Sequence, residues 1–396
     1  MKYETRKLKD LLQPKGYIRG PFGSALKRGD LQKSGIPVYE QQHAIHGTRA
    51  FRFYVGQEKY QELKRFTTEE NDLIISCSGT IGKVSIIQPS DPTGIISQAL
   101  LILRCNTDIV LPQFLYYFLS SAQGYHSITS VSSGSVQVNI AKREVIENID
   151  VPYLDLQVQN RIVSVLQCID NKIEMNKKVN ENLYTQAKTI FYESFINIDT
   201  ISDGWEKGNL LDIANYLNGL AMQKFRPQEN ENGIPVLKIK ELRQGSCDTS
   251  SELCSPNIKP EYIIRDGDVI FSWSGSLLVD IWCGGTCGLN QHLFKVTSDT
   301  YDKWFYYLWT AHHLDRFIAV AADKATTMGH IKREELAKAE VLIPSEADYK
   351  KISAVMNPIF DLIIANRIEA RTLAELRDEL LPKLMSGEFD VSNIQL

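Results

Sequence analysis

The sequence predicts an α/β protein of the mixed α+β type. Two homologous globular domains are separated by two long helices that form an antiparallel coiled coil. Three observations support this fold: an apolar heptad pattern near the middle of the chain, the same pattern 190 positions later, and short motifs that recur in the same order in each half. Together they predict a pseudo-twofold internal repeat in which a globule and a helix each occur twice.

The first heptad pattern runs from about Val158 to about Phe195. Residues at alternating steps of three and four define the expected helix seam: Ile162, Val165, Ile169, Lys172, Asn176, Val179, Leu183, Gln186 and Ile190. This spacing is typical of a helix that packs along another helix. A surface helix packed only on its own domain could show the same pattern, but that interpretation leaves the second occurrence unexplained.

The second pattern matches the first position by position. Its expected seam is Ile352, Val355, Ile359, Leu362, Asn366, Glu369, Leu373, Leu376 and Leu380. Even the polar interruption recurs, since Asn366 corresponds to Asn176. A buried asparagine costs stability but fixes the register, because its amide requires a partner. We therefore predict that the two helices pair with each other, and that the second is kinked or restarts where Asn357 precedes Pro358.

The globules are related by motifs. GIPVYEQQ at Gly35 returns as GIPVLKIK at Gly233, and FLYYFL at Phe114 returns as WFYYLW at Trp304. The predicted segments are a globular domain at 1–152, a helix at 153–197, a second globular domain at 198–344, and a C-terminal helix with a tail at 345–396. Strands are expected in the first globule at Pro37–Glu40, Phe51–Tyr54, Leu73–Cys77, Lys83–Gln88 and Ala99–Arg104, followed by a helix that begins at Pro112.

Composition indicates an ordinary globular protein, with 43% hydrophobic and 23% charged residues. The chain starts without an apolar signal-peptide core and contains no long apolar stretch, so we expect a cytoplasmic protein without membrane contact. Seven cysteines, an odd number, indicate reduced thiols. Four of them, Cys247, Cys254, Cys283 and Cys287, lack the spacing of a zinc knuckle, so no metal site is predicted.

The net charge of −4 is unevenly distributed. Residues 1–152 contain 18 basic and 14 acidic residues, whereas residues 198–344 contain 15 basic and 20 acidic residues. An acidic total argues against a free-standing nucleic-acid binder with one broad basic face. Local basic loops or partner subunits would have to supply the positive charge.

No catalytic residues are predicted. The turn SGTIGKV at Ser78 resembles a phosphate-binding loop, but Cys77 occupies the position of the first glycine. NPIF at Asn357 resembles part of the adenine methyltransferase loop, yet it lacks the second proline and follows no glycine-rich cofactor turn.

The loops offer groups that can bind DNA. Amide, hydroxyl and basic side chains recognise base edges and contact phosphates. The candidates in the first half are Gln41, Gln42, His43, Lys83, Gln98, Ser133, Ser135, Gln137 and Asn139. The candidates in the second half are Gln223, Lys224, Lys238, Lys240, Asn290, Gln291, Thr326, Thr327 and His330.

Four stretches resemble the specificity, or DNA-recognition, subunits of Type I restriction–modification systems. They are SDGWEKGNLLDIANYLNGL, ISCSGTIGKV, ATTMGHIKREEL and LRDELLPKLMSGEFDV, and the resemblance extends over essentially the whole chain. The second globule has SGSLLVDIW where the first has SGTIGKV, so a contact by Lys83 has no counterpart there.

The resemblance implies a non-catalytic subunit with two target-recognition domains, each specific for one half of a bipartite site in double-stranded DNA. It implies that the helices set the spacing and dock two adenine-N6 methyltransferase subunits, and that two restriction/translocase subunits join them. No cofactor is expected on this chain, since S-adenosylmethionine, ATP and Mg²⁺ would be bound by the partners. The alternatives are a scaffold without DNA specificity and a fused methyltransferase, for whose cofactor domain the chain has no spare residues.

Overall fold

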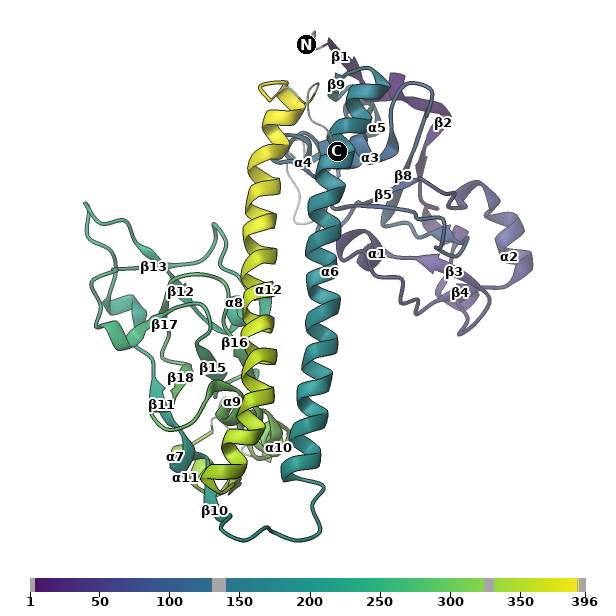
Figure 1. Ribbon diagram of the computed structural model, residues 1–396. Helices are drawn as coiled ribbons and strands as arrows, with labels where there is room; N and C mark the ends of the chain where they lie inside the picture. The colour runs from purple at the N-terminus through teal and green to yellow at the C-terminus, as the bar shows by residue number, and fades with distance from the viewer. Residues whose placement is uncertain (1–3, 130–139, 324–330, 390, 392–396) are drawn as a thin grey trace. The chain divides into compact units, whose positions relative to one another are not determined.

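A computed structural model describes residues 4–129, 140–323, 331–389 and 391. The chain forms two compact units, one made of residues 1–170 and 374–396 and the other of residues 171–373. Each unit contains one globule and a segment of both long helices, α6 (Leu156–Phe195) and α12 (Glu346–Ser386) (Figure 1). The predicted division into four segments stays a prediction, because the two units divide at other positions, between residues 170 and 171 in α6 and between residues 373 and 374 in α12.

The described part of the first globule contains two small sheets and a separate two-stranded pair. The larger has the order β2 (Leu12–Arg19), β8 (Leu100–Cys105), β5 (Leu73–Ser76) and β6 (Val84–Ile86), with antiparallel neighbours. The smaller has the order β4 (Tyr54–Val55), β3 (Ile36–Tyr39) and β7 (Ile95–Ile96). β1 (Glu4–Lys7) pairs with β9 (Asp150–Tyr153), which joins the start of the globule to its end. The helices are α1 (Gln41–Ile45), α2 (Gln57–Glu62), α3 (Pro112–Ser120), α4 (Ala122–Thr129) and α5 (Arg143–Glu147).

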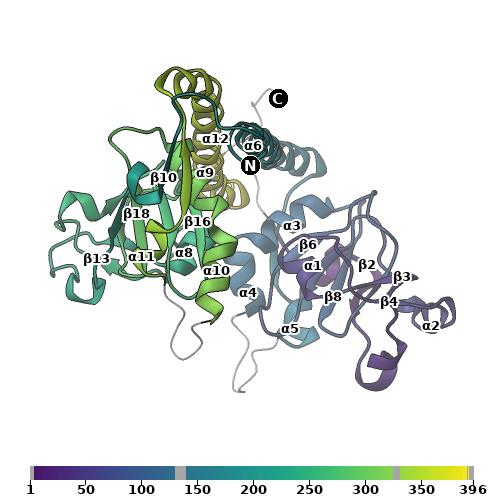
Figure 2. The same cartoon turned by 90° about the horizontal axis from the view of Figure 1, so that it is seen from below.

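Each strand expected in this globule overlaps an observed one, although Phe51–Tyr54 does so only at Tyr54. The helix expected at Pro112 is α3, which packs between the larger sheet and the long helices (Figure 2). Its Phe114 and Phe118 are fully buried in one cluster with Leu101 of the sheet. The same cluster contains Ile162 and Leu166 of α6 and Leu381 and Leu384 of α12, so this globule is anchored on both helices.

The second globule repeats this topology. Its first sheet has the order β11 (Asn215–Asn218), β18 (Leu293–Thr297), β15 (Val269–Ser272) and β16 (Leu278–Ile281). Its second sheet has the order β13 (Leu253–Cys254), β12 (Ile234–Leu237), β17 (Cys287–Leu289) and β14 (Ile263–Ile264). β10 (Glu206–Asn209) pairs with β19 (Glu340–Ile343), as β1 does with β9. The helices are α7 (Leu210–Ile213), α8 (Ile239–Gln244), α9 (Lys303–His312), α10 (Leu314–Asp323) and α11 (Arg333–Ala337).

Helix α9 corresponds to α3 and anchors the second globule in the same way. Its Trp304 and Phe305 are fully buried in a cluster with Phe191 of α6 and with Met356 and Phe360 of α12. The predicted duplication is therefore confirmed by the strand order and by the helix that covers each larger sheet.

The long helices run antiparallel. In the second unit, Lys172 Nζ of α6 lies 3.1 Å from Glu369 Oε2 of α12, and Asn180 Nδ2 donates to the Ile363 carbonyl at 3.0 Å. Both predicted asparagines are buried. Asn176 Nδ2 donates to Glu369 Oε2 at 2.7 Å, and Asn366 Nδ2 donates to Asn180 Oδ1 at 2.9 Å. Each amide has a partner, as its burial requires, and the role in register stays a prediction.

Seven alternate positions of the predicted seam are wrong, whereas Val165, the remaining alternate position, is half-buried. Val179, Val355, Leu362 and Leu376 are 37%, 52%, 45% and 44% exposed, and Lys172, Gln186 and Glu369 are exposed as well. The observed seam alternates steps of four and three residues from Ile162, whereas the predicted seam alternates steps of three and four from the same residue. On α6 it is Ile162, Leu166, Ile169, Ile173, Asn176, Asn180, Leu183 and Ala187, all buried or half-buried. The globules decide which positions form the seam. Residues one position after the seam residues, such as Phe191 and Phe360, are buried in a globule core and are therefore unavailable to the other helix.

Helix α12 is continuous through Pro358, so a restart after Asn357 is wrong, while the kink stays a prediction. Proline removes one helical donor, which would have bonded to the carbonyl of Ala354. Ala354 and Pro358 are both exposed, so water can bind that carbonyl. Within the described residues, no helix combines the length and apolarity needed to cross a bilayer.

Candidate nucleic-acid interface

Helix α1 of the first globule contains three of the predicted DNA-binding residues. His43 is its third residue and is fully buried. Glu40 N donates to His43 Nδ1 at 2.6 Å, so the other ring nitrogen, 3.3 Å from the Ala50 carbonyl, is the donor. The ring stacks on Phe51 with 4.6 Å between centroids, and burial lowers the pKa of His43. A neutral His43 thus closes the N-terminus of α1 as the acidic member of a capping box does.

Gln41 and Gln42 lie on the first turn of α1 and are half-buried. Gln42 Nε2 donates to the Ala50 carbonyl at 3.2 Å. Gln41 Nε2 has no hydrogen-bond partner among the described residues. Since a buried unpaired donor is costly, Gln41 is the better placed of the two to gain a bond when a ligand binds.

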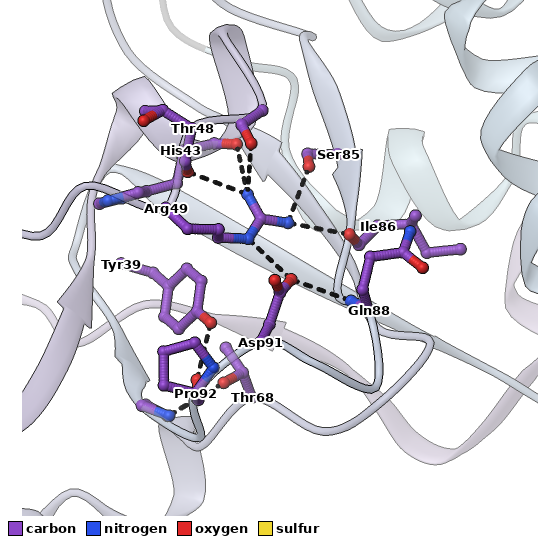
Figure 3. A network of polar contacts seen from close by, with 12 residues as sticks. Tyr39, His43, Thr48, Arg49, Thr68, Ser85, Ile86, Gln88, Asp91 and Pro92 are labelled. Carbon is purple, nitrogen blue, oxygen red and sulfur yellow. Dashed lines mark hydrogen bonds and ion pairs between the residues drawn. The ribbon is translucent and has the colours of Figure 1, made fainter. Parts of the chain in front are cut away.

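A half-buried arginine, Arg49, holds the chain that follows α1 (Figure 3). Arg49 Nε lies 2.7 Å from Asp91 Oδ2, and the two side chains are 21% and 8% exposed. The other guanidinium nitrogens donate to backbone carbonyls, including those of His43 and Ile86, and to Ser85 Oγ. These bonds fix α1 relative to β6 and the loop that follows it.

Lys83 and Gln98 are exposed on neighbouring loops. Lys83 follows the turn between β5 and β6, and its Nζ lies 4.8 Å from the centroid of the Tyr125 ring. Gln98 lies beside Gly20, where a Cβ would come within 2.0 Å of the Ser97 carbonyl, so only glycine permits this approach. Ser133, Ser135, Gln137, Asn139, Thr326, Thr327 and His330 lie outside the described residues.

In the second globule, helix α8 takes the place of α1. Glu241 occupies the position of His43, and its Oε2 accepts from Lys238 N at 3.3 Å. The candidate lysines beside it carry acidic partners: Lys238 Nζ lies 2.5 Å from Glu252 Oε1, and Lys240 Nζ lies 3.3 Å from Asp248 Oδ2. Both pairs are largely exposed, so DNA phosphates could replace the carboxylates at small cost.

The other candidates of this globule differ in exposure. Gln223 and Lys224 are exposed on a short 3₁₀ helix after β11. Asn290 is buried, and its Oδ1 accepts from His292 N at 3.2 Å. Gln291 is half-buried, with Nε2 3.3 Å from His292 Nε2. Gln223 and Lys224 are thus at the surface, whereas Asn290 shapes its own loop.

Sequence reasoning missed a basic groove in the first globule. Two adjoining cavities of about 570 and 390 Å³ lie along β2 and share Tyr17, Arg65 and Arg143 as lining residues. Their cationic residues are Lys15, Arg19, Arg65, Arg104, Lys142 and Arg143. They come from separate segments without a run of basic residues, so no local sequence signal marks the groove.

Comparison with known proteins matches residues 1–185 and 202–376 to the model of the Type I restriction modification DNA specificity domain. The chain belongs to this family. Its two matched segments correspond to the two halves of the internal repeat, which agrees with the predicted fold class. DNA specificity, rather than catalysis, is the role that defines the family.

The relatives carry the same designation. The MjaIX specificity subunit of a Type I restriction enzyme from Methanocaldococcus jannaschii is 28% identical over 313 residues, 72% of this chain and 71% of that one. The MjaVIII specificity subunit of the same organism is 22% identical over 359 residues, 84% and 82% of the two chains. The crystal structure of a Type I S subunit from M. genitalium shares the fold, with a TM-score of 0.56, 14% identity, and coverage of 97% and 96%.

Proposed function

We propose that this chain is the DNA-binding specificity subunit of a Type I restriction–modification complex, in which each globule recognises one half of a bipartite site. The observation that carries the proposal is the duplication: two globules with one strand order are each anchored on both long helices. A protein with two equivalent recognition domains matches a DNA site with two half-sites.

Exposed loop residues would make the DNA contacts. In the first globule these are Lys83 and Gln98, with Gln41 as a donor that gains a partner on binding. In the second they are Gln223 and Lys224, joined by Lys238 and Lys240 once their carboxylate partners are displaced. Buried His43 and Asn290 would act by holding their loops rather than by touching DNA. Gln42, Gln291 and the candidates outside the described residues remain proposed contacts.

The long helices would dock two modification subunits. In the second unit, docking would use the side of the helix pair that its globule leaves uncovered. In the second unit, residues that follow the seam, such as Phe360, enter the globule core. Residues one position before the seam residues form an exposed row on each helix, and Val179 and Leu362 belong to these rows. The ion pair between Lys172 and Glu369 places these two rows on one side of the helix pair. An exposed aliphatic row of this kind suits the helix of a partner.

The proposal assigns the chemistry to the partners. S-adenosylmethionine would be bound by the modification subunits, and ATP and Mg²⁺ by two restriction/translocase subunits. Helix α6 has 40 residues and extends about 60 Å at about 1.5 Å per residue. A rod of that length can keep the two recognised half-sites a constant number of base pairs apart.

A domain exchange tests the proposal. Residues 1–152 are replaced by the corresponding domain of a relative, and adenine methylation is mapped in cells that also express the modification subunits. One half of the methylated motif should change, while the other half and the spacer stay as they were. Methylation without sequence preference would instead support the scaffold alternative, and methylation by the purified chain alone would support the fused methyltransferase.

A second experiment tests the docking side. Leu362→Glu introduces a charge into the exposed row, and we expect it to weaken co-purification with the modification subunits at least tenfold, about 1.4 kcal/mol. Asp361→Lys, which changes the charge at an exposed position about 100° around α12 from Leu362, is the control and should leave assembly unchanged. Equal effects of the two variants would show that the row is not the docking surface.

A further inference from the structure

The basic groove of the first globule is built on an irregular edge strand. β2 lies at the edge of its sheet, and its pairing with β8 shifts between Leu12 and Tyr17. The residues between them bulge out of the strand, and Lys15 adopts a φ of 65°, a conformation uncommon outside glycine. The bulge therefore presents the exposed Lys15 at one end of the groove.

Most of the groove's positive charge is available to a ligand. Lys15, Arg65 and Lys142 are exposed, and none of them has an acidic partner among the described residues. Arg143 is paired with Glu147 at 2.7 Å, but its side chain is 56% exposed and its guanidinium lies 4.9 Å from the Tyr17 ring centroid.

Arg104 is the exception in this groove. It is 18% exposed and is held by Asp72 and Glu69. Arg104 therefore supports the groove wall, while Lys15, Arg65 and Lys142 create a strip of uncompensated charge.

The duplicated topology identifies the counterpart of each groove position. Gly20 N and Gly219 N donate to the carbonyls of Leu100 and Leu293, so Arg19 corresponds to Asn218. The short helices Lys64–Phe66 and Pro260–Tyr262 correspond, which places Glu261 opposite Arg65 in the alignment.

One further difference removes positive charge from the second globule. From Leu11 to Tyr17 the first globule has five intervening residues, whereas from Ile213 to Tyr216 the second has two. The bulge with Lys15 is therefore absent at the described counterpart. The cations that persist are Lys332 and Arg333, which match Lys142 and Arg143.

We propose that the groove formed by Lys15, Arg65, Lys142 and Arg143 binds the DNA phosphate backbone, and that the described part of the second globule has no equivalent strip. The two half-sites then contribute unequally to the salt-dependent part of the DNA affinity. The inference rests on the proposed function. Cations that neutralise phosphates release counterions, and such contacts set the register without carrying sequence information.

The test uses the specificity chain in its complex with the modification subunits and a duplex that contains the methylated motif. Lys15→Gln, Arg65→Gln and Lys142→Gln are combined, since all three side chains are exposed and the fold should be retained. The slope of log affinity against log KCl concentration should become shallower by about 2.7, at about 0.9 per lost phosphate contact. The methylated motif should remain the same.

A charge-matched control in the second globule combines Lys259→Gln, Lys332→Gln and Arg333→Gln, which are also exposed. This set removes the same charge, so a general effect of charge would change the slope equally. Because the described part of the second globule lacks the strip, the slope should instead change by less than half as much. A reciprocal variant, Glu261→Arg, should steepen the slope by about 0.9 by adding one phosphate contact.

The outcomes separate the inference from the proposed function. An unchanged slope with an intact methylated motif would overturn the phosphate strip alone. Equal changes in the two triple variants would overturn the asymmetry. Altered base preference in one half-site would show that the groove contacts bases instead. A wild-type complex that binds DNA without sequence preference would overturn the proposed function itself.

Discussion

The two globules keep one backbone arrangement with different polar chemistry. In the first, the loop after α1 is held by the nearly buried pair of Arg49 and Asp91. In the second, the segment after α8 is held by the exposed pairs of Lys238 with Glu252 and Lys240 with Asp248. The role of the third helical residue is retained, although His43 fills it in one globule and Glu241 in the other. The difference teaches that the duplicated topology constrains geometry, while the loops remain free to change in charge.

The largest expected effect concerns the buried pair. Arg49→Met should lower the free energy of unfolding of the first unit by about 3 kcal/mol, because it leaves the nearly buried Asp91 carboxylate without its cation and with the bond from Gln88 N. Lys240→Met should cost the second unit less than about 1 kcal/mol, because its pair is exposed. Denaturant titration followed by hydrogen exchange of each unit measures both. Equal losses of unfolding free energy would contradict the contrast between a nearly buried and an exposed ion pair.

A smaller effect is expected where the helices pair. Asn176 and Asn366 bond across the seam of the second unit, whereas in the first unit Asp170 of α6 accepts from Arg377 of α12 and from Tyr117. Changing both asparagines to leucine should keep or raise the thermal stability, by about 1 kcal/mol at most, while loosening the register or promoting self-association. Size-exclusion chromatography with light scattering and cysteine cross-linking along the helices report this. A monomer with unaltered pairing would count against a role in register.

The smallest effect is a dependence on pH. Burial lowers the pKa of His43, so the folded state prefers the neutral ring, while the unfolded chain takes up a proton at about pH 6.5. The stabilisation is present above that pH and is lost as the pH falls toward the folded-state pKa. His43→Gln keeps a capping side chain that does not titrate, so the first unit should lose less stability on acidification.

The second unit provides the control for that measurement. Burial also lowers the pKa values of His312 and His313, so its stability should still fall with pH in the His43→Gln variant. Hydrogen exchange resolved for each unit, at neutral and mildly acidic pH, measures the pH dependence of the stability of each unit separately. A first unit that keeps its full pH dependence without His43 would show that another group is responsible.

The sequence by itself determined the two long helices, their pairing and the duplication, because periodicity and recurrence are properties of residue order. It also indicated the loops after the central strands, and Lys83, Gln98, Gln223 and Lys224 are indeed at the surface.

Only the tertiary structure decided which side of each helix forms the seam, because the step order is set by the globules packed beside it. Tertiary structure also decided that His43 is buried and that Lys15, Arg65 and Lys142 share one groove. These three cations are separated by tens of residues, and the sheet and the short helices around it bring them together. Charge that gathers through folding leaves no pattern along the chain, whereas a helix seam repeats within every two turns.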